Sequence, residues 1–193
     1  MASRYDDELW ELVPELGNRP PAHIVDFVRS LGSAERALDV GCGDGRLSAE
    51  LDARRLVAAD PSRVALERAG QRLGPDAELV ELEPDHELPV EDSQFDLVLC
   101  AETLEHVRDV QLFLSEIRRV LRPGGTLAIT TPAHNRLTGL RILVRGFDTC
   151  FDPLSPHLRF FTKRSLTRLL DEMGFDVRSM RREKGTLLAI ARR

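Results

Sequence analysis

Short apolar runs alternate along this chain with segments of helical periodicity, and this alternation restricts the fold more than any other feature. The runs are short, mostly aliphatic and therefore predicted strands: Ala37–Val40, Leu56–Ala59, Leu79–Leu82, Phe95–Cys100 and Leu127–Thr130. Between them, helices are predicted from about Asp44, over Ser62–Leu73 and between Val110 and Leu121. Strands separated by helices are typical of a parallel sheet that is covered on both faces.

The carboxyl-terminal part follows a different pattern. A predicted helix, Lys163–Met173, precedes two apolar runs, Phe175–Met180 and Thr186–Ala191, which only the turn Glu183–Gly185 and its neighbours separate. This connection is too short for a crossover, so the last two strands must be antiparallel. We therefore predict an α/β fold, doubly wound around a mostly parallel sheet, with an antiparallel carboxyl-terminal hairpin.

Length and composition indicate one globular domain over residues 1–193. The net charge of −5 argues against a general nucleic-acid-binding protein, because such proteins bind mainly by neutralising phosphates. No apolar run approaches the ~20 residues of a membrane span, and the first ten residues lack the layout of a signal peptide, so a cytoplasmic protein is expected. Cys42, Cys100 and Cys150 are odd in number and widely spaced, which predicts reduced thiols.

A glycine-rich loop follows the first predicted strand in the stretch LDVGCGDGRL. Gly41, Gly43 and Gly45 let bare backbone approach a ligand, but Arg46 stands where a dinucleotide motif needs its third glycine, and no lysine of a nucleotide-phosphate loop is near. Nearby acids favour a ligand with positive charge and no phosphate. S-adenosylmethionine has these properties, and Asp60 closes the second strand where a carboxylate accepts the ribose hydroxyls of a nucleoside.

These features resemble the class I S-adenosylmethionine-dependent methyltransferases, and among them the type 11 group. The matching stretches cover most of residues 37–175: LDVGCGDG, AADPS, ELPVEDSQFDLVLCAETLEHV, RRVLRPGGTLAITTP and FFTKRSLTRLLDEMGF. The resemblance implies a seven-stranded, Rossmann-like sheet with the antiparallel hairpin at one edge.

The resemblance also implies roles for residues at matching positions. Asp39, Gly41 and Gly43 would contact the methionine portion of S-adenosylmethionine, Asp60 would bind the ribose hydroxyls, and Ala101 is a further cofactor-binding candidate. The family usually places an acid near the adenine amino group where this chain has Pro84. Glu83 or Asp85 would substitute for that acid.

Glu102, Glu105 and His106 form an E-x-x-E-H cluster after the fourth strand. In a helical turn the three side chains would converge. The cluster resembles one in ubiquinone-pathway O-methyltransferases and in 2′-O-methyltransferases of small-RNA 3′ ends, with His157 as the positional match for a downstream histidine. Two interpretations stay open: a divalent metal site, or metal-free catalysis by His106 with His157 nearby. We favour the second, because Glu102 and Glu105 suit the first turn of the next helix.

Two segments are candidates for covering the site. Residues 1–19 predict an amphipathic helix, as a lid or as packing, and residues 133–161 are too long for a simple connection. The second segment holds four of the eight phenylalanines, so we expect it to bury itself over the sheet edge and to roof a pocket for an apolar or aromatic acceptor. Alternatively, it only shields the cofactor from water.

The sequence thus predicts a methyltransferase that methylates a hydroxyl of a small molecule, of phenolic, lipid-like or sugar type. Two alternatives stay open: a metal-dependent RNA 3′-end 2′-O-methyltransferase, and a catalytically silent S-adenosylmethionine-binding protein. A small-molecule acceptor is the expected partner rather than nucleic acid. The acceptor, the methylated atom and the oligomeric state leave no signal in the sequence.

Overall fold

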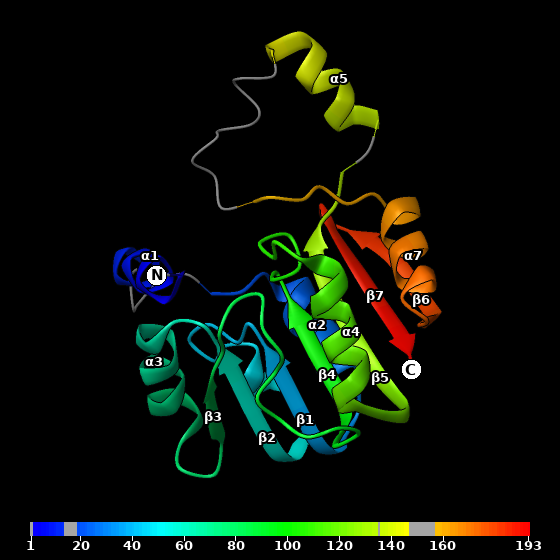
Figure 1. Ribbon diagram of the computed structural model, residues 1–193. Helices are drawn as coiled ribbons and strands as arrows, with labels where there is room; N and C mark the ends of the chain where they lie inside the picture. Colours follow the sequence, from blue (N-terminus) through cyan, green and yellow to red (C-terminus); the bar gives the residue numbers. More distant parts are fainter. Residues whose placement is uncertain (1, 14–18, 135, 147–156) are drawn as a thin grey trace.

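One sheet of seven strands forms the centre of the molecule, in the order β3-β2-β1-β4-β5-β7-β6 (Figure 1). The structure is a computed structural model that describes residues 2–13, 19–134, 136–146 and 157–193. The strands are β1 Ala34–Val40, β2 Ala53–Asp60, β3 Glu78–Glu81, β4 Phe95–Ala101, β5 Leu121–Pro132, β6 Asp176–Glu183 and β7 Thr186–Arg192. The first five pair in parallel, and β7 pairs antiparallel with both β5 and β6. The predicted fold class, hairpin included, is confirmed.

Helices cover both faces of the sheet, as the alternation of strands and helices predicts. The helices of the described chain are α1 Ala2–Leu12, α2 Ala22–Arg29, α3 Arg63–Leu73, α4 Val110–Val120, α5 Arg136–Arg145 and α7 Lys163–Glu172, and of these α2, α3, α4 and α7 pack on the sheet. Leu38 and Val40 of β1 pack in a cluster with α4 and α7, whereas Ala37, which points the other way, packs with α2. Burial on both faces explains why the parallel strands are apolar throughout.

The helices begin where side chains satisfy their first backbone N–H groups. Ser62 accepts from the Ala65 amide before α3, and Asp109 accepts from the Gln111 and Leu112 amides before α4. Before α7, Thr162 and Ser165 form a reciprocal capping box. Helix α4 therefore begins at Val110, and neither Glu102 nor Glu105 lies in its first turn. We favoured metal-free catalysis because Glu102 and Glu105 suited the first turn of this helix, and that reason was wrong.

The helix expected from about Asp44 is absent from this described part of the chain. Turns and one short 3₁₀ segment, Ser48–Glu50, occupy its place. Gly45 has a φ of 76°, outside the helical region, and β2 already begins at Ala53, so too few residues remain for a regular helix. The Pro-Gly-Gly turn lies inside β5 as a bulge, because Phe95 pairs with Leu121 whereas Leu97 pairs with Thr126.

The carboxyl ends of β1, β2 and β4 lie side by side, since β1 pairs with both other strands. The glycine loop, Asp60 and the segment after Ala101 therefore share one edge of the sheet, where open α/β sheets bind ligands. The helix α5 stands beyond this edge (Figure 1). Among the described residues, no helix is long and apolar enough to cross a membrane.

Candidate functional site

The glycine loop turns back over the end of β2. Gly41, Gly43 and Gly45 have φ values of 76°, 54° and 76°, a region that disfavours other residues. The Gly41 and Cys42 amides both donate to the Ala59 carbonyl, at 2.7 and 3.0 Å. These two hydrogen bonds hold the glycine backbone after β1 against the end of β2, in the interior of the sheet edge.

Side chains from distant segments stand directly on two of these glycines. A Cβ atom on Gly41 would lie 2.4 Å from Oγ1 and Cγ2 of Thr103, and one on Gly43 would lie 2.6 Å from Cζ2 of Trp10. Neither position has room for a larger residue. We call this loop, which Thr103 and the helix α1 flank, the cradle.

Asp60 braces the loop from below. Its Oδ2 accepts from the Gly43 amide at 2.8 Å, and its Oδ1 accepts from the Ser62 amide at 2.9 Å. Burial raises the pKa of Asp60 to about 6, against the effect of these two hydrogen bonds. Each carboxylate oxygen still has a lone pair for a further donor.

Asp39 offers an acceptor that the described protein does not use. Its side chain is buried, and Oδ2 accepts from the Ser48 hydroxyl at 2.6 Å, but Oδ1 meets no donor among the described residues. Burial, with the charge of Asp60 adding to it, raises the pKa of Asp39 to about 7. An unsatisfied buried carboxylate oxygen is costly, so this site suits a ligand that donates hydrogen bonds or carries positive charge.

Asp44 lies in the same loop but does not add to this negative charge. Its carboxylate pairs with Arg46 at 2.6 Å and with Arg72 at 3.3 Å. The two arginines neutralise it within the protein. Arg72 comes from α3, so the sequence near the loop gave no sign of its contact with Asp44.

Two cavities lie on either side of Gly41. The larger, of about 320 Å³, is lined by Asp39, Gly43, Ala101, Glu102 and Trp10 among others. The smaller, of about 170 Å³, is lined by residues that include Pro61, Glu83, Asp85, Thr103 and His106. Gly41 lines both cavities, so the two cavities adjoin at the glycine loop.

The backbone carbonyl groups of Gly41 and Ala101 share one hydrogen-bond donor, the hydroxyl of Thr103. The Thr103 hydroxyl lies 3.3 Å from the Gly41 oxygen and 3.0 Å from the Ala101 oxygen. A hydroxyl has a single proton, so it satisfies one of the two carbonyls at a time. A ligand group with several N–H donors would satisfy both.

The predicted adenine-side acids line the smaller cavity unequally. The Glu83 side chain is largely exposed and lies 3.8 Å from His86, whereas Asp85 is more enclosed and lies 3.6 Å from Arg108. Asp85 also has a left-handed φ of 62°, which turns the chain at the cavity wall. Of the two acids, Asp85 therefore has the side chain that is less exposed to solvent at the wall of the smaller cavity.

Glu102 separates from the rest of the E-x-x-E-H cluster. Residues 102–107 form turns rather than a helix, and Glu102 has a left-handed φ of 51°. Its Oε1 accepts from the Thr130 hydroxyl at 2.8 Å, and its side chain lines the larger cavity. Burial and the nearby Glu105 raise its pKa to about 7. The expected convergence of all three side chains is wrong for Glu102.

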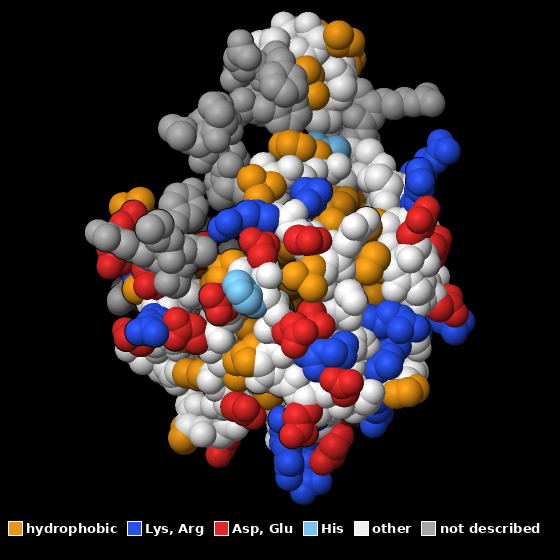
Figure 2. Space-filling view, viewed as in Figure 1, with side chains coloured by type: hydrophobic (Ala, Val, Ile, Leu, Met, Phe, Trp, Pro, Cys, Tyr) orange, Lys and Arg blue, Asp and Glu red, His pale blue; other side chains and the backbone are white. Residues whose placement is uncertain are grey.

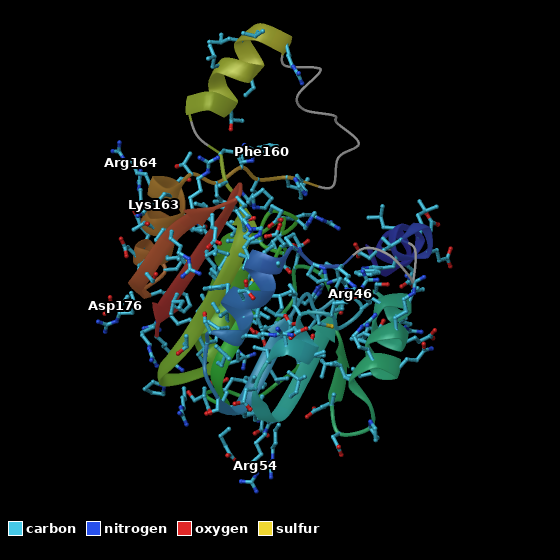
Figure 3. The ribbon with its side chains drawn as sticks, turned by 180° about the vertical axis from the view of Figure 1, so that it is seen from behind. Arg46, Arg54, Phe160, Lys163, Arg164 and Asp176 are labelled. Atoms are coloured by element: carbon cyan, nitrogen blue, oxygen red, sulfur yellow. The ribbon has the colours of Figure 1, made fainter. Side chains whose placement is uncertain are left out.

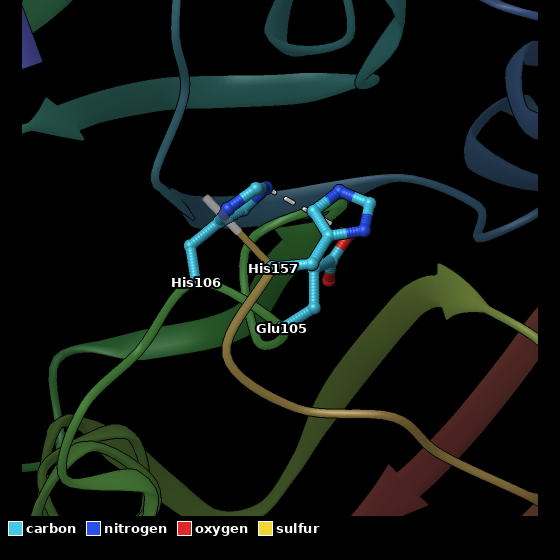
Figure 4. Close-up of side chains that lie close together, drawn as sticks. All are labelled: Glu105, His106 and His157. Carbon is cyan, nitrogen blue, oxygen red and sulfur yellow. Dashed lines mark ion pairs between the residues drawn. The ribbon is translucent and has the colours of Figure 1, made fainter. Parts of the chain in front are cut away.

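Glu105, His106 and His157 do come together (Figure 4). Their donor atoms lie within 4.8 Å of one another, and the rings of His106 and His157 meet edge to face at 4.9 Å. Glu105 is buried, and its Oε2 accepts from the Thr131 hydroxyl at 2.9 Å. Its backbone oxygen accepts from the Leu158 and Arg159 amides, which holds His157 in place. Burial and the neighbouring His106 lower the pKa of His157.

The segment between residues 133 and 161 is tied to the sheet at both ends. Ala133 bridges to Phe161, and the His134 amide donates to the Phe161 oxygen at 2.8 Å. Between these ties, Leu140, Leu143 and Val144 of α5 are exposed, so the expected burial of this segment is wrong for these residues, whereas Phe161 at its end is buried. Phe147 and Phe151 lie outside the described residues. Phe160 packs edge to face on His134 rather than in either cavity.

Comparison with known proteins is consistent with this arrangement. Residues 38–129 match a family model described as a methyltransferase domain. A probable S-adenosylmethionine-dependent methyltransferase of Mycolicibacterium smegmatis is 36% identical over 72% of this chain and 51% of its own length. A ubiquinone biosynthesis O-methyltransferase of Nitrobacter winogradskyi is 32% identical over 74% of this chain and 57% of its own.

Among solved structures, a SAM-dependent methyltransferase from Aquifex aeolicus superposes with a TM-score of 0.68. It is 19% identical, over 90% of this chain and 94% of its own, and this likeness concerns the fold. The chain spans about half the length of the first curated relatives that it matches.

Proposed function

Because the chain belongs to the class I S-adenosylmethionine-dependent methyltransferases, we propose that it methylates a hydroxyl group of a small molecule, of phenolic, lipid-like or sugar type. The observation that supports the cofactor in this proposal most is the buried Oδ1 of Asp39, which meets no donor among the described residues and lies beside the backbone of Gly41 and Gly43. An anionic cradle without lysine suits a cationic, phosphate-free cofactor.

The residues present fit S-adenosylmethionine, whose cationic sulfonium supplies an activated methyl group when the cofactor is bound. Asp39, Gly41, Gly43 and Ala101 would hold its amino-acid portion, and the convergent carbonyls of Gly41 and Ala101 suit its ammonium group.

Asp60, which precedes Pro61 in the wall of the smaller cavity, would accept the ribose hydroxyls. Glu83 or Asp85, which line that cavity, would accept from the adenine amino group. The two cavities that meet at Gly41 together match an elongated nucleoside with an amino-acid tail.

In this proposal His106 takes the proton of the acceptor hydroxyl, and His157 orients His106 through their edge-to-face contact. The lowered pKa of His157 keeps that imidazole neutral at pH 7, so it does not repel a protonated neighbour. A positioned base of this kind contributes about 10²–10⁴ in rate.

One observation favours a second candidate. Glu105, His106 and His157 bring a carboxylate and two imidazoles together, a donor set that suits a divalent ion. A metal-dependent transfer, to a small molecule or to the 2′-hydroxyl at an RNA 3′ end, is therefore the alternative. In that case both histidines would bind the ion, and His106 would not act as a base.

Label transfer tests the proposal directly. Methyl-labelled S-adenosylmethionine is incubated with the protein and a lipid and phenol extract, or with an RNA pool, and Asp39→Asn serves as the cofactor-site control. We expect label in the extract and not in the RNA. Label at RNA 3′ ends would establish the alternative. Tight cofactor binding without transfer to either pool would indicate a catalytically silent protein.

A further inference from the structure

The helix α5 projects beyond the carboxyl edge of the sheet (Figures 1 and 3). Seven large hydrophobic side chains are exposed in the described part of the chain. Five of them belong to α5 or to the extended residues 157–160 that precede α7. We call these five the projecting surface: Leu140, Leu143, Val144, Leu158 and Phe160. Leu143 and Val144 are 83% and 77% exposed, so they contact little of the protein.

Leu140, Leu143 and Val144 are spaced i, i+3 and i+4 along α5, so they share one face of the helix, and exposed apolar side chains grouped in this way mark an interaction surface. Figure 2 shows hydrophobic atoms on the projecting helix, well away from the body of the sheet. Phe160 lies beneath α5, on the side where Lys163 and Arg164 begin α7 (Figure 3).

The charge of this region is opposite to that of the rest of the chain. Residues 133–168 contain seven basic side chains and two acids, a net charge of +5, whereas the other residues carry −10. The sequence of α5, RLTGLRILVR, has three arginines and no acid. Basic residues of α5 and of the start of α7 therefore lie in the same part of the described chain as the exposed apolar side chains.

We propose that the projecting surface docks on an anionic lipid bilayer. A short helix with aliphatic side chains and arginines lies in the interface of a bilayer, with its apolar side chains inserted and its guanidinium groups at the lipid phosphates. The charge distribution favours this occupant, because an anionic surface would attract the net positive residues 133–168, and it sets the orientation, because the same surface would repel the net negative body. Docking therefore orients the protein with the carboxyl edge of its sheet toward the lipid.

This orientation has a consequence that rests on the proposed function. Leu158 and Arg159 are bonded through their amides to Glu105, beside His106 and His157. Docking through Leu158 and Phe160 would bring these histidines near the lipid. An apolar acceptor dissolved in the bilayer would then reach the site without crossing water.

Vesicle co-sedimentation of the full chain tests the proposal without turnover, so an error in the proposed function does not affect the result. The probes are vesicles of phosphatidylcholine alone and of phosphatidylcholine mixed with phosphatidylglycerol. We expect binding to the mixed vesicles, weakened by salt, and weak binding to phosphatidylcholine alone. Leu143→Glu combined with Val144→Glu should weaken binding at least about tenfold, because both apolar insertion and charge attraction are lost.

Leu12→Glu is the matched control, because Leu12 is 81% exposed on α1 and outside the projecting surface. It should leave vesicle binding unchanged. Equal binding of the double variant and the unmodified protein would overturn the proposal, as would equal binding to both kinds of vesicle. Size-exclusion chromatography tests whether a second copy of the chain docks on this surface instead. If the unmodified protein is a dimer that does not bind vesicles, and the double variant is a monomer, the surface is a dimer interface and the proposal is overturned.

Discussion

Asp39 and Asp60 are buried carboxylates whose charges the described protein compensates incompletely. Burial raises the pKa of Asp39 to about 7 and that of Asp60 to about 6, both above the value of 3.8 for an exposed aspartate. The native state therefore binds protons more tightly than the unfolded chain. Without ligand, the contribution of both groups to stability falls as pH rises from about 4 to 7.

A cationic ligand reverses this dependence, since it prefers the ionised carboxylates. We predict that the affinity for S-adenosylmethionine rises as pH increases from about 5 to 8, and that calorimetry detects proton release on binding in the lower part of this range. Asp39→Asn should bind more weakly and with a flatter pH profile. An affinity of the unmodified protein that is independent of pH would contradict this account of the cradle.

His106 distinguishes the two mechanisms at the scale of a single residue. If His106 is the base, His106→Ala should lower kcat about 10²–10⁴-fold, whereas a chelator should leave activity unchanged. If Glu105, His106 and His157 hold a metal, a chelator should abolish activity and added Mn²⁺ or Mg²⁺ should restore it. Steady-state rates with and without chelator decide between them.

Glu102 provides the control for this experiment, because it lines the larger cavity and does not belong to the candidate metal ligands Glu105, His106 and His157. Under either mechanism, Glu102→Gln should not change the response to chelator. Full activity of His106→Ala together with insensitivity to chelator would contradict both mechanisms and would leave positioning as the source of catalysis.

At the scale of elements, α1 is the part most directly joined to the cradle. Asp7 accepts from the Ser62 hydroxyl at 2.7 Å and so reinforces the start of α3, and Arg68 of α3 donates to the Val13 oxygen at 2.9 Å. These bonds hold Trp10 against Gly43. The role of residues 1–19 as a lid stays a prediction, and the position of Trp10 provides a test.

Trp10 is the only tryptophan of the chain, so its fluorescence reports on α1 alone. We predict that S-adenosylmethionine changes this fluorescence and that Trp10→Ala weakens cofactor binding about 5–30-fold, since an aromatic wall of the cavity is lost. Trp10→Phe should retain most of the affinity. Leu12→Ala, on the exposed side of the same helix, should bind as the unmodified protein does. Unchanged fluorescence with unchanged affinity of Trp10→Ala would exclude a lid.

At the scale of the whole molecule, Arg119 joins α4 to the loop that walls the smaller cavity. Its guanidinium donates to the Leu88 and Val90 carbonyls and to Asp92, and it pairs with the largely buried Glu116 at 2.7 Å. Glu116 in turn accepts from the Leu88 amide at 2.9 Å. One charged pair therefore fixes a loop between β3 and β4 that has no regular structure of its own.

We predict that Arg119→Met lowers the free energy of unfolding by about 2–4 kcal/mol, because it leaves Glu116 buried without its partner and frees two carbonyl groups. Urea denaturation measures this change. Arg168→Met removes an exposed pair with Glu172 and should cost at most about 1 kcal/mol. Equal losses for the two variants would mean that the Arg119 network contributes little beyond a surface ion pair.

The sequence by itself determined the sheet, the hairpin and the position of the glycine loop. These features depend on periodicity and turn chemistry within about ten residues, which are local properties of the chain. The same locality explains the failure at Asp44, where the alternation of strands and helices predicted a helix that the next strand left no room to form.

Only the tertiary structure decided which groups meet at the cradle. Trp10, Thr103 and Arg72 reach the loop from segments 28 or more residues away, and no local pattern carried those contacts. Glu102 left its cluster because Thr130 of the neighbouring strand holds it. The sequence also did not reveal that α5 is exposed. The apolar content of a helix shows that it can bury a face, but the path of the backbone decides whether another element lies against that face.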